Sequence, residues 1–192
     1  MKWLCVVLLI SLGWPAWSDE GDASIVEERT DEFHDTLIEV LQVGEYAARY
    51  ALLEPAVERL FDLGTIARIS LGRTWRTLTA EQQAAFVELL RVSVVATYAS
   101  RFDEFNDQRF ERVETVATRQ GWVVKTLLVR RNAERVNLDY YYRDARVFNV
   151  VADGVSDLSL RRADYNSIIK QEGYVALVQY VEAKIQELGG RR

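Results

Sequence analysis

Few side chains in this sequence could act as a nucleophile or a base at neutral pH. The one cysteine, Cys5, lies in an apolar run near the start, and the one histidine, His34, precedes Asp35. A Ser-His-Asp or Cys-His mechanism needs a base placed beside the nucleophile. We therefore interpret His34 as a surface or hydrogen-bonded histidine. Because Cys5 lies in a segment that we expect to be removed as a signal peptide, we expect no thiol, disulfide or thiolate metal ligand in the mature chain.

Carboxylates and glycine turns give no stronger sign of catalysis. Residues 154–158 begin like the nucleophile elbow of a hydrolase, but Leu158 stands where the second glycine is required. Asp139, Asp153 and Asp157 could approach one another as paired carboxylates, although turns and helix caps also use aspartate. The sequence has no phosphate-binding glycine loop and no histidine cluster with metal-ligand spacing. This inventory favours binding over catalysis, with no cofactor.

The elements that must position these residues begin with helices. Residues 33–41 have helical apolar spacing, Gly44 is a break before a second helical stretch, and Pro55 can occupy the first turn of a further helix. Thr79 and Gln82 have the spacing of a capping box, which predicts a helix start. The long helix that follows is predicted to bury one stripe of apolar residues: Phe86, Leu89, Leu90, Val94, Tyr98 and Phe102.

From residue 110 the pattern changes to strands, and from residue 155 it returns to helices. The four predicted strands cover residues 110–118, 122–130, 136–143 and 146–151, with short connections that favour an antiparallel meander. Gly173 separates two final helices, and the second of these is amphipathic. The pattern predicts an α+β fold in which helices pack on a curved, mainly antiparallel four-stranded sheet.

Composition indicates one ordinary globular domain. Of the 192 residues, 49% are apolar and 28% charged, with a formal net charge of −5. Nucleic acid is an unfavourable partner for this acidic chain, because its arginine doublets are isolated. No cluster of basic residues compensates for the excess of acids.

The first residues have the pattern of a signal peptide. Lys2 precedes an apolar run over residues 3–14, and Pro15 and the acids from Asp19 onward end it before it could span a membrane. We predict cleavage after Ser18, which leaves residues 19–192 as a single domain in the periplasm. An uncleaved N-terminal anchor is the alternative.

Two segments resemble the MlaC family, also called the toluene-tolerance auxiliary family. In residues 61–90 the matching residues are Phe61, Asp62, Leu71, Gly72, Trp75, Thr79, Glu81, Gln82 and Phe86, followed by Tyr98 and Ala99. In residues 152–178 they are Gly154, Val155, Ser156, Arg162, Tyr165 and Gly173. The chain departs from the family by lacking a tryptophan before the G-V-S turn and by having Asn149 near the position of an aspartate. The second segment is most similar to the hopanoid-associated branch, HpnM.

The resemblance implies a noncatalytic lipid shuttle whose helices and sheet enclose an apolar cavity. Its ligand would be a hopanoid or a phospholipid, carried between the inner and outer membranes with transient docking to membrane-bound transport proteins. Arg162 is a candidate contact for an anionic headgroup or a partner acid, and a structural ion pair is the alternative interpretation of this residue. The residues expected to line the cavity are Trp75, Phe86, Leu90, Val124, Leu138, Tyr140, Tyr142, Val155, Leu158 and Tyr165.

Two alternatives come from other functional classes. A small-molecule enzyme on the same scaffold would need acid and base groups that converge in a pocket. A structural adaptor would have a filled core. A long apolar cavity without an ionisable catalytic pair would count against both.

Overall fold

The computed structural model describes residues 19–190. A helical first half is followed by a meander of strands and a helical end, as the sequence pattern predicts. The helices before the sheet are α1 (Asp19–Leu41), α2 (Tyr46–Leu60), α3 (Leu63–Leu71), the short 3-10 helix η1 (Thr74–Thr77) and α4 (Ala80–Arg101). Those after it are α5 (Asp157–Glu172) and α6 (Tyr174–Gly190).

The sheet has five antiparallel strands in sequence order and is open, with β1 and β5 at its edges. The strands are β1 (Arg109–Thr118), β2 (Gly121–Val129), β3 (Arg135–Arg143), β4 (Arg146–Ala152) and β5 (Val155–Ser156). The prediction of four strands was therefore wrong by one. The fifth strand has only two residues, formed where a turn at Asp153 and Gly154 folds the chain back onto β4. A strand that short leaves no alternation to detect.

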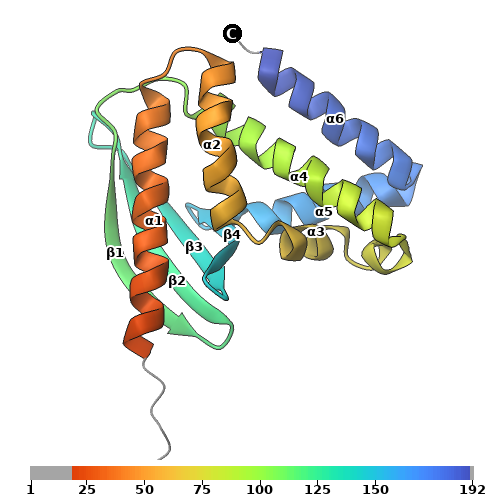
Figure 1. Cartoon of the computed structure of the whole chain (residues 1–192), viewed down its shortest axis with the longest axis horizontal. Helices are drawn as coiled ribbons and strands as arrows, with labels where there is room; N and C mark the ends of the chain where they lie inside the picture. Colours follow the sequence, from red (N-terminus) through yellow and green to blue (C-terminus); the bar gives the residue numbers. More distant parts are fainter. Residues whose placement is uncertain (1–18, 191–192) are drawn as a thin grey trace, which may run out of the picture.

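Helices cover one face of the sheet, which confirms the α+β prediction. In Figure 1, α1 runs along the β1–β2 side, while α2, α3 and α5 approach β4 and α6 packs against α4. The side chains of Val124, Tyr140 and Tyr142 point from the sheet into the shared core, where they meet Phe33 and Leu37 of α1. This core fixes the inner face of β2 and β3.

The predicted start of α4 is confirmed. The Gln82 backbone N–H donates to Thr79 Oγ1 at 3.3 Å, and the Thr79 N–H donates to Gln82 Oε1 at 2.9 Å, so both halves of the capping box are present. Phe86, Leu90 and Val94 of the predicted stripe are buried. The long amphipathic helix therefore begins where the sequence places it.

The expectation of a separate helix beginning at Pro55 was wrong, because α2 continues through this proline. A proline inside a helix removes one backbone hydrogen bond. Here Pro55 lies on the exposed side, while Leu53, Ala56 and Val57 bury the other side of the helix. Packing of that side outweighs the local cost.

The predicted signal peptide, residues 1–18, lies outside the described residues. Within residues 19–190, no helix is both long enough and apolar enough to cross a membrane.

Candidate functional site

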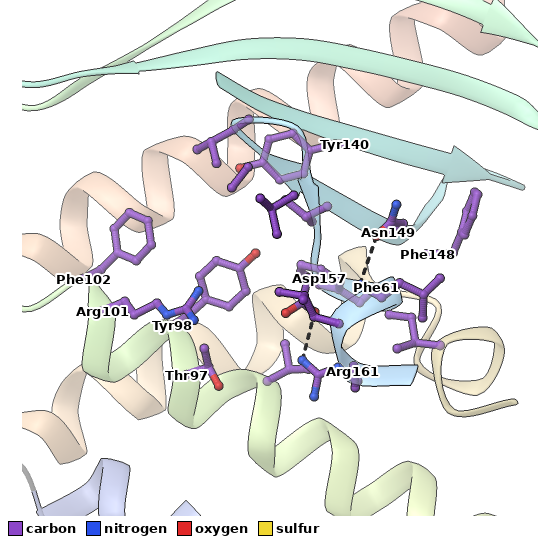
Figure 2. A pocket seen from close by; sticks show the side chains of 18 residues that line it. Phe61, Thr97, Tyr98, Arg101, Phe102, Tyr140, Phe148, Asn149, Asp157 and Arg161 are labelled. Carbon is purple, nitrogen blue, oxygen red and sulfur yellow. Dashed lines mark hydrogen bonds and ion pairs between the residues drawn. The ribbon is translucent and has the colours of Figure 1, made fainter. Parts of the chain in front are cut away.

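An apolar cavity of about 310 Å³ lies between α4, the start of α5 and the inner face of β3 and β4 (Figure 2). Its volume falls near the lower end of the roughly 300–1,000 Å³ typical of ligand pockets. Most of its lining is apolar or aromatic: Phe61, Ile66, Val94, Tyr98, Phe102, Leu138, Tyr140, Phe148, Val150, Ala152, Val155, Leu158 and Leu160. The polar lining residues are Thr97, Arg101, Asn149, Asp157 and Arg161.

Strands β3 and β4 form one wall of the cavity, and their pairing register decides which side chains line it. Leu138 pairs with Ala152 and Tyr140 with Val150 across β3 and β4, so these four side chains share one face. Phe61 joins the wall through a parallel bridge to β4, where the Asp62 N–H donates to the Val147 carbonyl at 2.8 Å. The helix between Val94 and Arg101 supplies the opposite wall.

The cavity is not enclosed, which corrects the expectation from the sequence. Val155 on β5 and Leu160 on α5 belong to its lining, yet they are 53% and 54% exposed. Both side chains therefore line the cavity and also meet solvent, so the cavity exposes apolar surface.

Asn149 organises the junction where β4, β5 and α5 meet at the cavity. Its Oδ1 accepts hydrogen bonds from Ser156 Oγ at 2.9 Å and from the Leu158 N–H at 3.2 Å. Ser156 in turn caps α5 by accepting from the Ser159 N–H at 3.1 Å. Asn149 thus supplies the acceptor that holds the start of α5 to β4.

Asp157 and Arg161 form the charged part of the wall. Arg161 Nη2 donates to Asp157 Oδ2 at 2.9 Å (Figure 2). Arg161 Nη1 donates to the Tyr165 hydroxyl at 3.2 Å. The carboxylate of Asp157 is therefore held in an ion pair with the guanidinium of Arg161. Asp139 points to the opposite face of β3, and Asp153 accepts from the Asn137 N–H at 2.8 Å, so the candidate aspartates do not converge.

The single histidine lies behind the cavity wall. His34 is buried, stacks on Phe110 with ring centroids 3.9 Å apart, and has Nε2 3.1 Å from the Tyr140 hydroxyl. Burial lowers the pKa of His34 to about 3, so its ring is neutral at pH 7. Burial also raises the pKa of the Tyr98 and Tyr140 hydroxyls, which stay protonated. The ring of Tyr140 separates His34 from the cavity.

The chemical inventory of this region is that of a binding site. Among residues 19–190, no group of three or more His, Cys, Asp or Glu residues could hold a metal ion. The cavity lining contains one carboxylate and neither histidine nor cysteine. The arrangement can bury an apolar ligand and offer it a few polar contacts at the wall.

Four of the ten residues expected at the cavity line it: Leu138, Tyr140, Val155 and Leu158. Trp75 lies half-buried on η1, away from the cavity. Phe86, Leu90, Val124, Tyr142 and Tyr165 instead pack in the solid core. Arg162 is exposed and does not line the cavity, whereas the preceding Arg161 does, because successive helical residues point in different directions.

Sequence reasoning missed several lining residues, including Phe61, Phe148 and Asn149. Tyr98 and Phe102 were already part of the stripe predicted for the long helix, so the far end of that stripe was an available signal. Phe61 gave no such signal, because only its bridge to β4 brings it to the cavity.

Helices on one face of an open antiparallel sheet, with an apolar cavity between the two layers, define a small-ligand-binding α+β protein. Residues 31–183 match the MlaC protein family, and the chain belongs to this family. No curated protein matches the sequence. The further resemblance to the hopanoid-associated branch stays a prediction.

One similar solved structure comes from Ralstonia solanacearum and is described as a phospholipid-binding protein in complex with a phospholipid. The two chains share 21% sequence identity and align with a TM-score of 0.73, over 87% of this chain and 98% of the other. At this identity the similarity establishes a common fold.

Proposed function

We propose that the protein is a periplasmic lipid carrier that moves a lipid between the inner and outer membranes as the soluble component of a transport system. The observation that carries this proposal is the open apolar cavity between α4, α5 and the sheet, in a chain of the MlaC family. The lipid is a phospholipid or a hopanoid. The phospholipid in the Ralstonia solanacearum structure supports the first choice, and the resemblance of residues 152–178 to the HpnM branch supports the second.

A carrier needs affinity for lipid tails more than it needs specific polar contacts. Each methylene removed from water contributes about 0.8 kcal/mol, so a tail segment buried in a cavity of about 310 Å³ is retained strongly in water. The exposed side chains of Val155 and Leu160 offer an apolar path from that cavity to a membrane or to a membrane-bound docking partner. Loading and release both require such a path.

The cavity also argues against the two alternative functions. A structural adaptor has no use for an unfilled apolar space, which costs stability. An enzyme needs acid and base groups that converge on a substrate, whereas Asp157 is paired with Arg161 and His34 lies behind Tyr140.

Filling the cavity tests the proposal. Val150 lines it from β4, so Val150→Trp should displace at least two tail methylenes and lower lipid loading from phosphatidylethanolamine and phosphatidylglycerol vesicles by about tenfold or more. Val151→Trp is the matched control, because the adjacent residue on the strand faces the other side of the sheet. Bound lipid per folded protein is measured by mass spectrometry. Equal loading of the two variants would place the ligand elsewhere.

A further inference from the structure

A second hollow lies next to the apolar cavity. It has a volume of about 720 Å³ and is bounded by the end of α4, the chain that follows it and the β2–β3 hairpin. The two spaces share two lining residues, Arg101 and Phe102, at the C-terminal end of α4. In Figure 2, Phe102 and Arg101 lie at the end of the cavity beside Tyr98.

Strand β3 connects the two spaces. Val136 lines the hollow, whereas Leu138 and Tyr140 line the cavity. Alternate residues of a strand share a face, so these three side chains follow one another along the same face of the sheet. A ligand lying along β3 could therefore extend from the cavity into the hollow past Phe102.

The two spaces differ in chemistry. The cavity has a mainly apolar wall, whereas charged and amide side chains line the hollow together with apolar residues such as Leu128 and Val136. Three arginines and three acids line the hollow: Arg101, Arg130, Arg131, Asp103, Glu104 and Glu134. Their equal numbers give it no net charge, which suits a zwitterionic group better than an anion alone.

Arg101 is the available cation of the hollow. Arg130 is paired with Glu134 at 3.1 Å, and Arg131 with Asp107 at 3.5 Å. No carboxylate among the described residues pairs with Arg101. The positive charge of Arg101 lies close enough to the Tyr98 hydroxyl to act against the rise that burial causes in the pKa of Tyr98. Asp103 and Glu104 likewise have no ion-pair partner within residues 19–190. An unpaired cation therefore stands at the junction, close to two unpaired acids.

We propose that this hollow is the headgroup site for a zwitterionic aminophospholipid. Its phosphate contacts Arg101, its ammonium group faces Asp103 and Glu104, and a tail passes Phe102 into the apolar cavity. The inference rests on the proposed lipid-carrier function and adds the class of lipid and the residues that select it. An uncharged hopanoid would leave Arg101 without a partner.

The test compares three lipids with the same acyl chains: phosphatidylethanolamine, phosphatidylglycerol and diacylglycerol. Arg101→Gln should weaken phosphatidylethanolamine binding about tenfold, as expected for loss of a charge-assisted hydrogen bond, and leave diacylglycerol binding unchanged. Arg135→Gln is the control, because Arg135 is exposed on β3 and lines neither space. Asp103→Asn combined with Glu104→Gln should abolish the preference for phosphatidylethanolamine over phosphatidylglycerol.

Equal losses for phosphatidylethanolamine and diacylglycerol in Arg101→Gln would show a structural role and overturn the assignment. No loss for either lipid would overturn it as well. Displacement of phosphatidylethanolamine by inorganic phosphate at comparable concentration would reassign Arg101 to a free anion. If the wild-type protein loads none of the three lipids, the carrier function itself fails, which is a separate outcome.

Discussion

Tyr140 takes part in two environments at once. Its ring forms part of the cavity wall, and its hydroxyl lies 3.1 Å from His34 Nε2 in the packing between α1 and the sheet. A buried hydroxyl and a buried imidazole each need a hydrogen-bond partner, and here they satisfy each other. The cavity wall at Tyr140 is therefore held in place by a hydrogen bond that lies on the side away from the cavity.

The buried histidine should make stability depend on pH. An unfolded chain protonates His34 with a pKa near 6.5, whereas burial lowers the pKa to about 3 in the folded chain. Between these values only the unfolded state gains the proton, so stability falls as the pH drops through 6.5. We expect His34 to contribute about 2 kcal/mol to the loss of unfolding free energy between pH 7 and pH 5.

Urea unfolding of the wild type and of His34→Gln at the two pH values measures this contribution. His34 is the only histidine in the chain, so the difference between the two pH slopes isolates it. The variant should lose about 2 kcal/mol less than the wild type over the interval. Parallel slopes would mean that the imidazole is accessible to protons in the folded state.

Individual residues also mark the limit of sequence prediction. Leu138, Tyr140 and Tyr142 were all expected to line the cavity, and all three lie on the inner face of β3. Whether an inward side chain meets a cavity or solid packing depends on its neighbours in space. The Tyr142 hydroxyl forms a hydrogen bond of 2.7 Å with Thr30 Oγ1 of α1. Tyr142 therefore packs in the solid core and does not reach the cavity.

At the scale of elements, the junction between β4 and α5 depends on a single amide side chain. Asn149 accepts from Ser156 Oγ and from the Leu158 N–H, and so ties the start of α5 to the sheet at the opening of the cavity. The first N–H groups of a helix have no partner within the helix. This contact supplies one, and it also positions Leu158 in the cavity wall.

We expect Asn149→Ala to lower the free energy of unfolding by about 1–2 kcal/mol, because two donors lose their acceptor. Asn149→Asp should stay close to the wild type, since a carboxylate keeps the acceptors and favours a helix N-terminus. Chemical unfolding of the three proteins measures both effects. Equal destabilisation by both substitutions would show that the amide NH₂ group, rather than the carbonyl oxygen, supports the junction.

Element prediction succeeded where a local signal agreed with packing. The Thr79–Gln82 capping box gave the start of α4 directly, and the short connections gave the antiparallel order of the strands. It failed where packing overrode the local signal. Pro55 continues a helix that its buried side stabilises, and β5 exists only because the turn after β4 brings two residues against that strand.

At the scale of the molecule, the helical layer and the sheet leave two adjoining spaces of different polarity. The apolar cavity lies against α4, α5 and the inner face of β3 and β4, and the polar hollow lies beyond Phe102. Such an arrangement accommodates an amphipathic ligand, with its apolar part buried and its polar part near water. The resemblance seen in the sequence predicted an apolar cavity, but the position of the hollow depends on how α4 ends against the β2–β3 hairpin.

The most direct test of the carrier function is native mass spectrometry of the wild-type protein purified from the periplasm, followed by extraction and identification of the bound lipid. We predict one lipid, a phospholipid or a hopanoid, on most of the folded chains. A phosphatidylethanolamine would agree with the headgroup site as well, whereas a hopanoid would support the carrier function but not that site. Folded protein that is consistently free of lipid would contradict the account.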